Sequence, residues 1–217
     1  MDLAKAFSFV FEDPDWVAKI VIGGLVGLIP IFGQLLVLGY MIAVGRNVIR
    51  GRPQPLPEWS EFGQLLADGQ YASVVGCVYI LPIVLVLCIV LLPLLAIGGA
   101  FNEQANLGTI SALGCFTGFA TLYGIVVVWL LLPAALARYA DTGDLMSALQ
   151  FSEVLAISRA NPIVFRKACL ASLAASLMAG LGLIFCIIGI WFTQFYAGCV
   201  MGHAYGQAYR VATERMA

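Results

Sequence analysis

Residues 15–50 read DWVAKIVIGGLVGLIPIFGQLLVLGYMIAVGRNVIR, which are two apolar runs separated by Pro30 and followed by arginines. The hydrocarbon core of a membrane is about 30 Å thick and needs roughly 20 mostly apolar residues per helix. The second run has this length, and neither run alternates with the period of two that is typical of a strand barrel. The stretch therefore predicts a hairpin of membrane helices, and the short first run leaves open whether the first helix spans fully.

The rest of the chain continues this pattern. Of its 217 residues 62% are apolar and only 11% are charged, whereas soluble domains usually carry about a quarter charged residues. The net charge of -1 leaves no basic face for nucleic acid. A soluble enzyme and a nucleic-acid partner are therefore excluded, and we expect one all-α, polytopic membrane domain, residues 1–217, in a lipid bilayer. Its apolar runs are 15–29, 31–49, 71–99, 108–138, 163–187 and 190–211.

The lysines and arginines fall into a few groups that alternate with the apolar runs. If the chain crosses six times from an inside N-terminus, all eleven lie on or near one face, and the outer connections at 30–31, 99–107 and 188–189 contain none. Basic residues are retained on the cytoplasmic side of a membrane. The charges thus predict about six membrane helices in three hairpins, with both termini cytoplasmic.

A short amphipathic segment precedes each predicted hairpin. The three segments are DLAKAFSFVFE at 2–12, PEWSEFGQLLADG at 57–69 and DLMSALQFSEV at 144–154. Their apolar residues recur at three- and four-residue steps, and helices of this kind lie in the plane of the membrane interface. We expect a cytoplasmic interfacial helix before each hairpin, and three repeat units at 1–52, 53–139 and 140–217.

Longer stretches resemble a known family. The run from FEDPDW at residue 11 to LLADG at residue 69 resembles the start of an uncharacterised prokaryotic membrane family, the domain-of-unknown-function 4013 family. RYADTGDLMSALQFSEVL at 138–155 and GHAYGQAYR at 202–210 are similar to the remainder of that family. The resemblance implies a small multi-pass protein of the prokaryotic plasma (inner) membrane. It brings with it no activity, cofactor or catalytic residue.

Small residues recur four apart in the last two apolar runs. Such spacing lets helix backbones approach closely within a membrane. Because a tight turn joins the two runs, we expect these residues to pack the fifth and sixth helices together, with self-association as the alternative. The residues are Gly198, Gly202 and Gly206 on the last helix, and Ser172, Ser176 and Gly180 on the fifth.

Among the polar residues inside the predicted membrane helices, Gln34, Gln194 and His203 are the candidates for a functional role. The glutamines either line a cavity or form hydrogen bonds between helices. His203 either relays protons or contacts a substrate, or it is a neutral side chain bonded to a neighbour. The runs contain no cluster of His, Asp, Glu or Cys that suits acid–base or metal chemistry. We therefore expect no enzyme, no catalytic or metal site and no cofactor.

The interface with the cytoplasm is the other candidate surface. Arg46, Arg50 and Arg52 follow the second run, and Trp59 and Phe62 follow them in the chain. The arginines either only orient the protein or also attract anionic headgroups, at about 1 kcal/mol per charge. The two aromatic residues suit interfacial anchors as well as a partner-binding site.

Two functions fit these features. The first is a non-enzymatic scaffold or accessory subunit that packs with itself, with lipids or with a membrane-protein partner, so that a homo-oligomer is one outcome. The second is a small transporter or channel for an uncharged or lipid-like solute, in which Gln34, Gln194 and His203 face a cavity. Coupled transport generally leaves ionisable residues in the membrane core, and these are nearly missing here. The sequence therefore favours the scaffold.

Overall fold

The chain folds into helices joined by short connections. The computed structural model describes residues 2–97 and 107–214, and within these ranges it contains no β-strand. The all-helical fold expected from the apolar runs is thus confirmed for the described part of the chain. In chain order the elements are α1 (Leu3–Ser8), η1 (Phe9–Glu12), α2 (Trp16–Gly27), α3 (Phe32–Ile49), α4 (Phe62–Ile97), α5 (Leu107–Val126), η2 (Val127–Leu131), α6 (Leu132–Thr142), α7 (Leu145–Ala148), α8 (Phe151–Ala160), α9 (Pro162–Leu181), η3 (Gly182–Phe185) and α10 (Cys186–Thr213).

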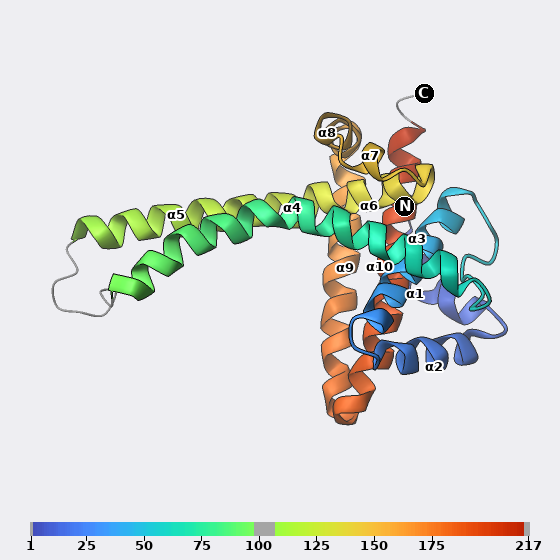
Figure 1. Cartoon of the computed structure of the whole chain (residues 1–217). Coiled ribbons are helices and arrows are strands. Elements are labelled where there is room, and N and C mark those ends of the chain that lie inside the picture. The colour runs from blue at the N-terminus through green and yellow to red at the C-terminus, as the bar shows by residue number, and fades with distance from the viewer. Residues whose placement is uncertain (1, 98–106, 215–217) are drawn as a thin grey trace.

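Two parts of the molecule are distinct in Figure 1. The second half of α4 and the whole of α5 run side by side away from the other helices, and we call residues 80–97 and 107–126 the arm. All other described residues form the head. Within the head, α9 and α10 make a second long hairpin that points in a different direction from the arm (Figure 1).

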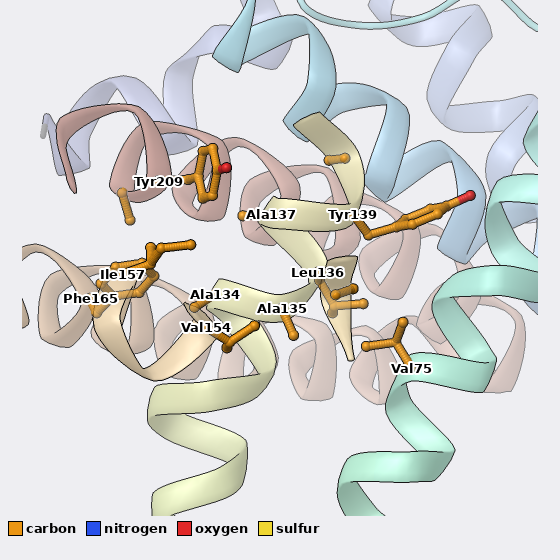
Figure 2. Close-up of a cluster of buried hydrophobic side chains, with 14 of the residues drawn as sticks. Val75, Ala134, Ala135, Leu136, Ala137, Tyr139, Val154, Ile157, Phe165 and Tyr209 are labelled. Carbon is orange, nitrogen blue, oxygen red and sulfur yellow. The ribbon is translucent and has the colours of Figure 1, made fainter. Parts of the chain in front are cut away.

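The core of the head surrounds α6. Ala134, Ala135 and Ala137 are almost fully buried, and their small side chains let neighbouring helices approach α6 on several sides. Figure 2 shows side chains of α4, α8, α9 and α10 converging on this helix. They include Val75, Val154, Ile157, Phe165 and Tyr209.

Helices α3 and α4 cross in direct backbone contact. A Cβ atom added to Gly39 would collide with the carbonyl oxygen of Leu65, and one added to Gly69 would collide with the carbonyl oxygen of Leu35. Each glycine therefore makes room for the backbone of the other helix. Any side chain at either position would push the two helices apart.

A π-helical turn marks the junction of arm and head. The helix of residues 107–142 changes at Val127–Leu131 from α to π geometry and returns to α geometry at Leu132, next to Pro133. The hydroxyl of Ser158, in α8, donates a hydrogen bond of 2.9 Å to the carbonyl oxygen of Leu130. This hydroxyl gives a carbonyl of the π turn an additional donor and ties α8 to the junction.

Three helices of the described chain are long and apolar enough to cross a membrane. They are Phe32–Ile49, Phe62–Ile89 and Pro162–Leu181, and they indicate a membrane protein. Helix α2 has only 12 residues, which is about 18 Å at 1.5 Å per residue and too short to span. The arrangement of six membrane helices in three hairpins stays a prediction.

Two predicted details are wrong. The segment at 57–69 is not a separate interfacial helix, because Phe62 begins α4 and the helix continues unbroken into the apolar run. The connection predicted at 188–189 lies inside α10, whereas α9 ends at Leu181 and η3 follows it. The reversal comes earlier because Gly182 lets the chain pass closely by Ile190 and Thr193. Of the connection predicted at 99–107, all but Leu107 lies outside the described residues.

The first and third amphipathic segments begin alike. Asp2 precedes α1 and accepts a hydrogen bond from the backbone N–H of Lys5. Asp144 precedes α7 and accepts from the N–H groups of Met146 and Ser147, each at 3.1 Å. Both aspartates satisfy N–H groups that the first helical turn leaves free. The division into three repeat units stays a prediction.

Candidate functional site

His203 lies inside the head, with 3% of its surface exposed. Its ring stacks on that of Phe9 with the centroids 4.2 Å apart. Among the described residues Nδ1 has no hydrogen-bond partner. An imidazole that is buried without satisfying both nitrogens is costly, so this side chain is the first candidate for a functional group.

A cavity of about 380 Å³ borders His203. It lies between α1, the C-terminal half of α10 and the segment that follows α3. Its charged lining residues balance, since Lys5, Arg52 and Arg210 stand against Asp2, Glu12 and Glu214. We call it the histidine cavity.

The two glutamines are not gathered with His203. Gln34 donates through Nε2 to the carbonyl oxygen of Gly27 at 2.8 Å, so it joins the start of α3 to the end of α2. Gln194 is exposed on α10. Neither lines the histidine cavity, and the sequence interpretation that placed all three around one cavity is therefore wrong for this cavity.

The glycines of α10 pack against a different helix from the one expected. A Cβ atom on Gly202 would collide with the carbonyl oxygen of Met41, and one on Gly206 would lie 2.7 Å from the carbonyl oxygen of Gly45. Both therefore pack against α3 and not against α9. Gly198 has open space on its Cβ side.

The small residues of α9 also differ from the prediction. Ser176 and Gly180 are exposed, and only Ser172 reaches α10, where its hydroxyl lies 3.1 Å from that of Tyr205. The face of α9 that meets α10 lies one residue before the predicted positions 176 and 180, and it consists of alanines. Ala175 and Ala179 pack there with Ala197 and Val200 of α10.

A buried ion pair joins α3 to α4. The guanidinium of Arg46 donates to both carboxylate oxygens of Asp68, at 2.8 and 2.9 Å. Its Nε donates to the carbonyl oxygen of Ala140 in α6 at 3.0 Å. The hydroxyl of Tyr139 donates to Asp68 at 3.0 Å, and burial together with the nearby carboxylate raises the pKa of Tyr139, so the phenol stays protonated as a donor.

This pair was missed in the sequence. Arg46 was predicted to be interfacial, but 10% of its side chain is exposed and it is part of the core. The sequence does contain a sign of the pair, because Arg46 lies one turn inside an apolar helix and Asp68 lies near the start of the next. Opposite charges in such places are typical of a pair, since an unpaired buried charge is very unfavourable.

A second buried pair holds the start of α2. Nζ of Lys19 lies 2.8 Å from a carboxylate oxygen of Asp13 and 2.8 Å from one of Glu58. Nε1 of Trp59 donates to the carbonyl oxygen of Lys19 at 3.2 Å. The indole is 7% exposed and stacks on the ring of Tyr40. Trp59 is thus a core residue rather than the predicted interfacial anchor.

Phe62 and the two remaining arginines lie where an interfacial residue would be expected, at the surface. Phe62 is 47% exposed, and Arg50 and Arg52 are exposed as well. Both arginines border a second cavity, of about 410 Å³, which the pair of Arg46 and Asp68 also lines. We call it the loop cavity, because the segment at 50–61 forms its wall.

Arg52 borders both cavities. The segment at 50–61 therefore separates the histidine cavity from the loop cavity. Among the described residues no group of three or more His, Cys, Asp or Glu side chains is placed to hold a metal ion.

Comparison with known proteins gives a family but no function. The family described as "Protein of unknown function (DUF4013)" matches residues 22–191. Neither a curated protein nor a solved structure matches the chain. The match covers most of the chain, including α3, α4 and the ion pair between them, and confirms the resemblance found in the sequence. The chain therefore belongs to the DUF4013 family.

Proposed function

We propose that this protein is a non-enzymatic membrane scaffold or accessory subunit, which packs through its arm against lipid and against a second copy or another membrane protein. The observation that carries the proposal is the arm itself. Several of its large apolar side chains are not covered by the head, as Ile89 and Phe119 show with 70% and 69% of their surface exposed. Large uncovered apolar surfaces mark sites of membrane or protein contact.

The contacts that fix α3 against α4 in the head support the proposal. The glycine contact of Gly39 with Gly69 and the ion pair of Arg46 with Asp68 fix α3 against α4. The arm continues from this same α4 without a break. A fixed base with an uncovered apolar hairpin is an arrangement that can hold a neighbour in a defined position.

We further propose that the protein is a multi-pass protein of the prokaryotic plasma (inner) membrane. Lys5, Arg50, Arg52 and Arg210 gather around the two cavities. Because basic residues are retained on the cytoplasmic side, this end of the head would face the cytoplasm, together with both termini. The apolar surfaces of the arm and of α9 would lie in the bilayer.

A second candidate function is a small transporter or channel for an uncharged or lipid-like solute. One observation favours it, namely the unpartnered Nδ1 of His203 beside a cavity. The positions of Gln34 and Gln194 outside that cavity weaken this candidate. We therefore retain the scaffold as the main proposal.

Native mass spectrometry of the protein in native lipid particles tests the two candidates. We expect a defined homo-oligomer or a stoichiometric partner, which dissociates in the variant Phe119→Ala/Leu122→Ala of the arm. The matched control is Leu177→Ala/Met178→Ala on α9, where both residues are also exposed; this variant should leave the assembly intact. A monomer that passes a solute across liposomes, and loses this ability on His203→Ala, would overturn the scaffold proposal.

A further inference from the structure

The loop cavity has a built polar floor. Arg46, Asn47 and Asp68 line it and are 9%, 6% and 6% exposed. Asn47 donates through Nδ2 to the carbonyl oxygen of Pro55 at 3.0 Å. The floor is thus fixed by hydrogen bonds to the wall of the cavity, and it is more than a depression between flexible surface side chains.

The wall is fixed at both of its ends. Gly51 has a φ of 68°, which turns the chain sharply after α3 and suits glycine. The N–H of Arg52 then donates to the carbonyl oxygen of Asn47 at 3.0 Å. Further along, the hydroxyl of Tyr40 donates to the carbonyl oxygen of Pro57 at 2.9 Å. The backbone that carries Arg50 and Arg52 is therefore held in place before any ligand arrives.

Two of the three arginines that line the loop cavity make no ion pair in the described chain. Three arginines line it against three acids, which are Glu58, Glu61 and Asp68. Asp68 is paired with Arg46, and Glu58 is paired with Lys19 from outside the cavity. Lys19 is also bound by Asp13, whereas Arg50 and Arg52 have no carboxylate within ion-pair distance among the described residues. The formal charges of the lining sum to zero, so the cavity offers an anion two unpaired guanidinium groups rather than a net positive charge.

The carboxylate of Glu61 accepts a hydrogen bond from the side chain of Gln64. With the amide of Gln64 oriented to satisfy both of its ends, its nitrogen donates to Glu61 at 3.1 Å and its oxygen accepts from Arg46 at 3.2 Å. Two guanidinium groups remain with their donors unused by the described protein. Guanidinium donors match the geometry of phosphate oxygens and can bind them in pairs.

We propose that the loop cavity binds a phosphate-bearing ligand, either the headgroup of an anionic lipid or a soluble phosphate, through the side chains of Arg50 and Arg52. Its volume of about 410 Å³ lies within the range typical of small-molecule sites. Arg46, Asn47 and Asp68 form the polar floor beneath the ligand. The inference is independent of the scaffold proposal, because it concerns the head and not the arm.

The test uses the whole protein in a neutral maltoside detergent, stripped of lipid, at constant ionic strength so that screening does not change. One measurement adds inorganic phosphate. The other adds phosphatidylglycerol in mixed micelles, with the phosphate-free lipid diacylglycerol as its blank. Binding is measured by calorimetry and by the shift of the thermal unfolding midpoint. A response to phosphate alone supports a soluble ligand, and a response to phosphatidylglycerol alone supports a headgroup.

The variant Arg50→Gln/Arg52→Gln should weaken binding about tenfold or more, a loss of at least about 1.4 kcal/mol, because the charge-assisted hydrogen bonds of both guanidinium groups are removed. Arg159→Gln/Arg166→Gln removes the same charge from exposed positions elsewhere and should bind as the wild type does. Arg50→Lys/Arg52→Lys keeps the charge but not the paired donors, and should fall between. No response to either probe, or an equal loss in both glutamine variants, would overturn the proposal.

Discussion

Arg46 and Asp68 lie 22 residues apart in the sequence, yet their side chains meet in a bidentate ion pair inside the head, 10% and 8% exposed. Because Arg46 also bonds the backbone of α6, three helices depend on one guanidinium. Removing one partner would leave the other charged, buried and unpaired.

We expect Arg46→Ala and Asp68→Ala each to lower the free energy of unfolding by about 3–5 kcal/mol, the usual cost of an orphaned buried charge. Chemical unfolding followed by circular dichroism in detergent measures this. The double variant Arg46→Met/Asp68→Leu should recover part of the loss. Two single losses that simply add in the double variant would show that the pair is not coupled.

Lys19 offers a comparison between two carboxylates that bind the same ammonium group. The side chain of Asp13 is 5% exposed and that of Glu58 is 70% exposed. An exposed ion pair contributes about 0–1 kcal/mol, so Glu58→Gln should change the unfolding free energy little. Asp13→Asn should cost several times more, because it removes the buried negative charge that pairs with the buried ammonium group of Lys19. Equal effects of the two variants would contradict this prediction.

Gly69 and Gly76 test the crossing of α3 and α4, because both lie in α4. Gly69→Ala should destabilise the protein strongly, since its Cβ would collide with the carbonyl oxygen of Leu35. Nothing lies near the Cβ position of Gly76, and Gly76→Ala should raise stability by up to about 1 kcal/mol through helix propensity. Thermal unfolding of the two variants side by side gives opposite shifts if the crossing is correct.

Gly202 and Gly198 form a matched pair on α10. Gly202→Leu should prevent the approach of α3 and lower the unfolding midpoint, because its Cβ position is filled by the backbone at Met41. A Cβ atom at Gly198 meets nothing within 4 Å, so Gly198→Leu should lower the unfolding midpoint much less than Gly202→Leu does. If Gly198→Leu instead shifts the elution volume to that of a smaller species, this face of α10 takes part in self-association.

Much of the fold could be predicted from composition and hydropathy. The predicted run at 31–49 and the helix Phe32–Ile49 nearly coincide, as do the starts of the run at 163–187 and of the helix Pro162–Leu181. Continuous apolar runs and prolines are local signals, and they locate helices directly. The length of the first run leaves open whether its helix spans fully, and the 12 residues of α2 answer that question.

The candidate site was less accessible to prediction because it depends on which helices meet. The spacing of Gly202 and Gly206 shows that one face of α10 is small, but it does not tell which helix fills that face. Trp59 and Arg46 were placed at the surface for the same reason, since their partners Tyr40 and Asp68 come from other elements. Only the fold reveals that Arg50 and Arg52 border a cavity.

The π turn at Val127–Leu131 has a consequence for the whole helix of residues 107–142. One extra residue in a turn rotates everything after it by about 100° relative to an unbroken α-helix. The side chains of α6 therefore point in directions that differ by this rotation from those that continue the pattern of α5. Phe119 and Leu122 of α5 are exposed, whereas the alanines of α6 point into the core (Figure 2). One continuous helix thus serves two different surroundings, with its faces reset at the π turn.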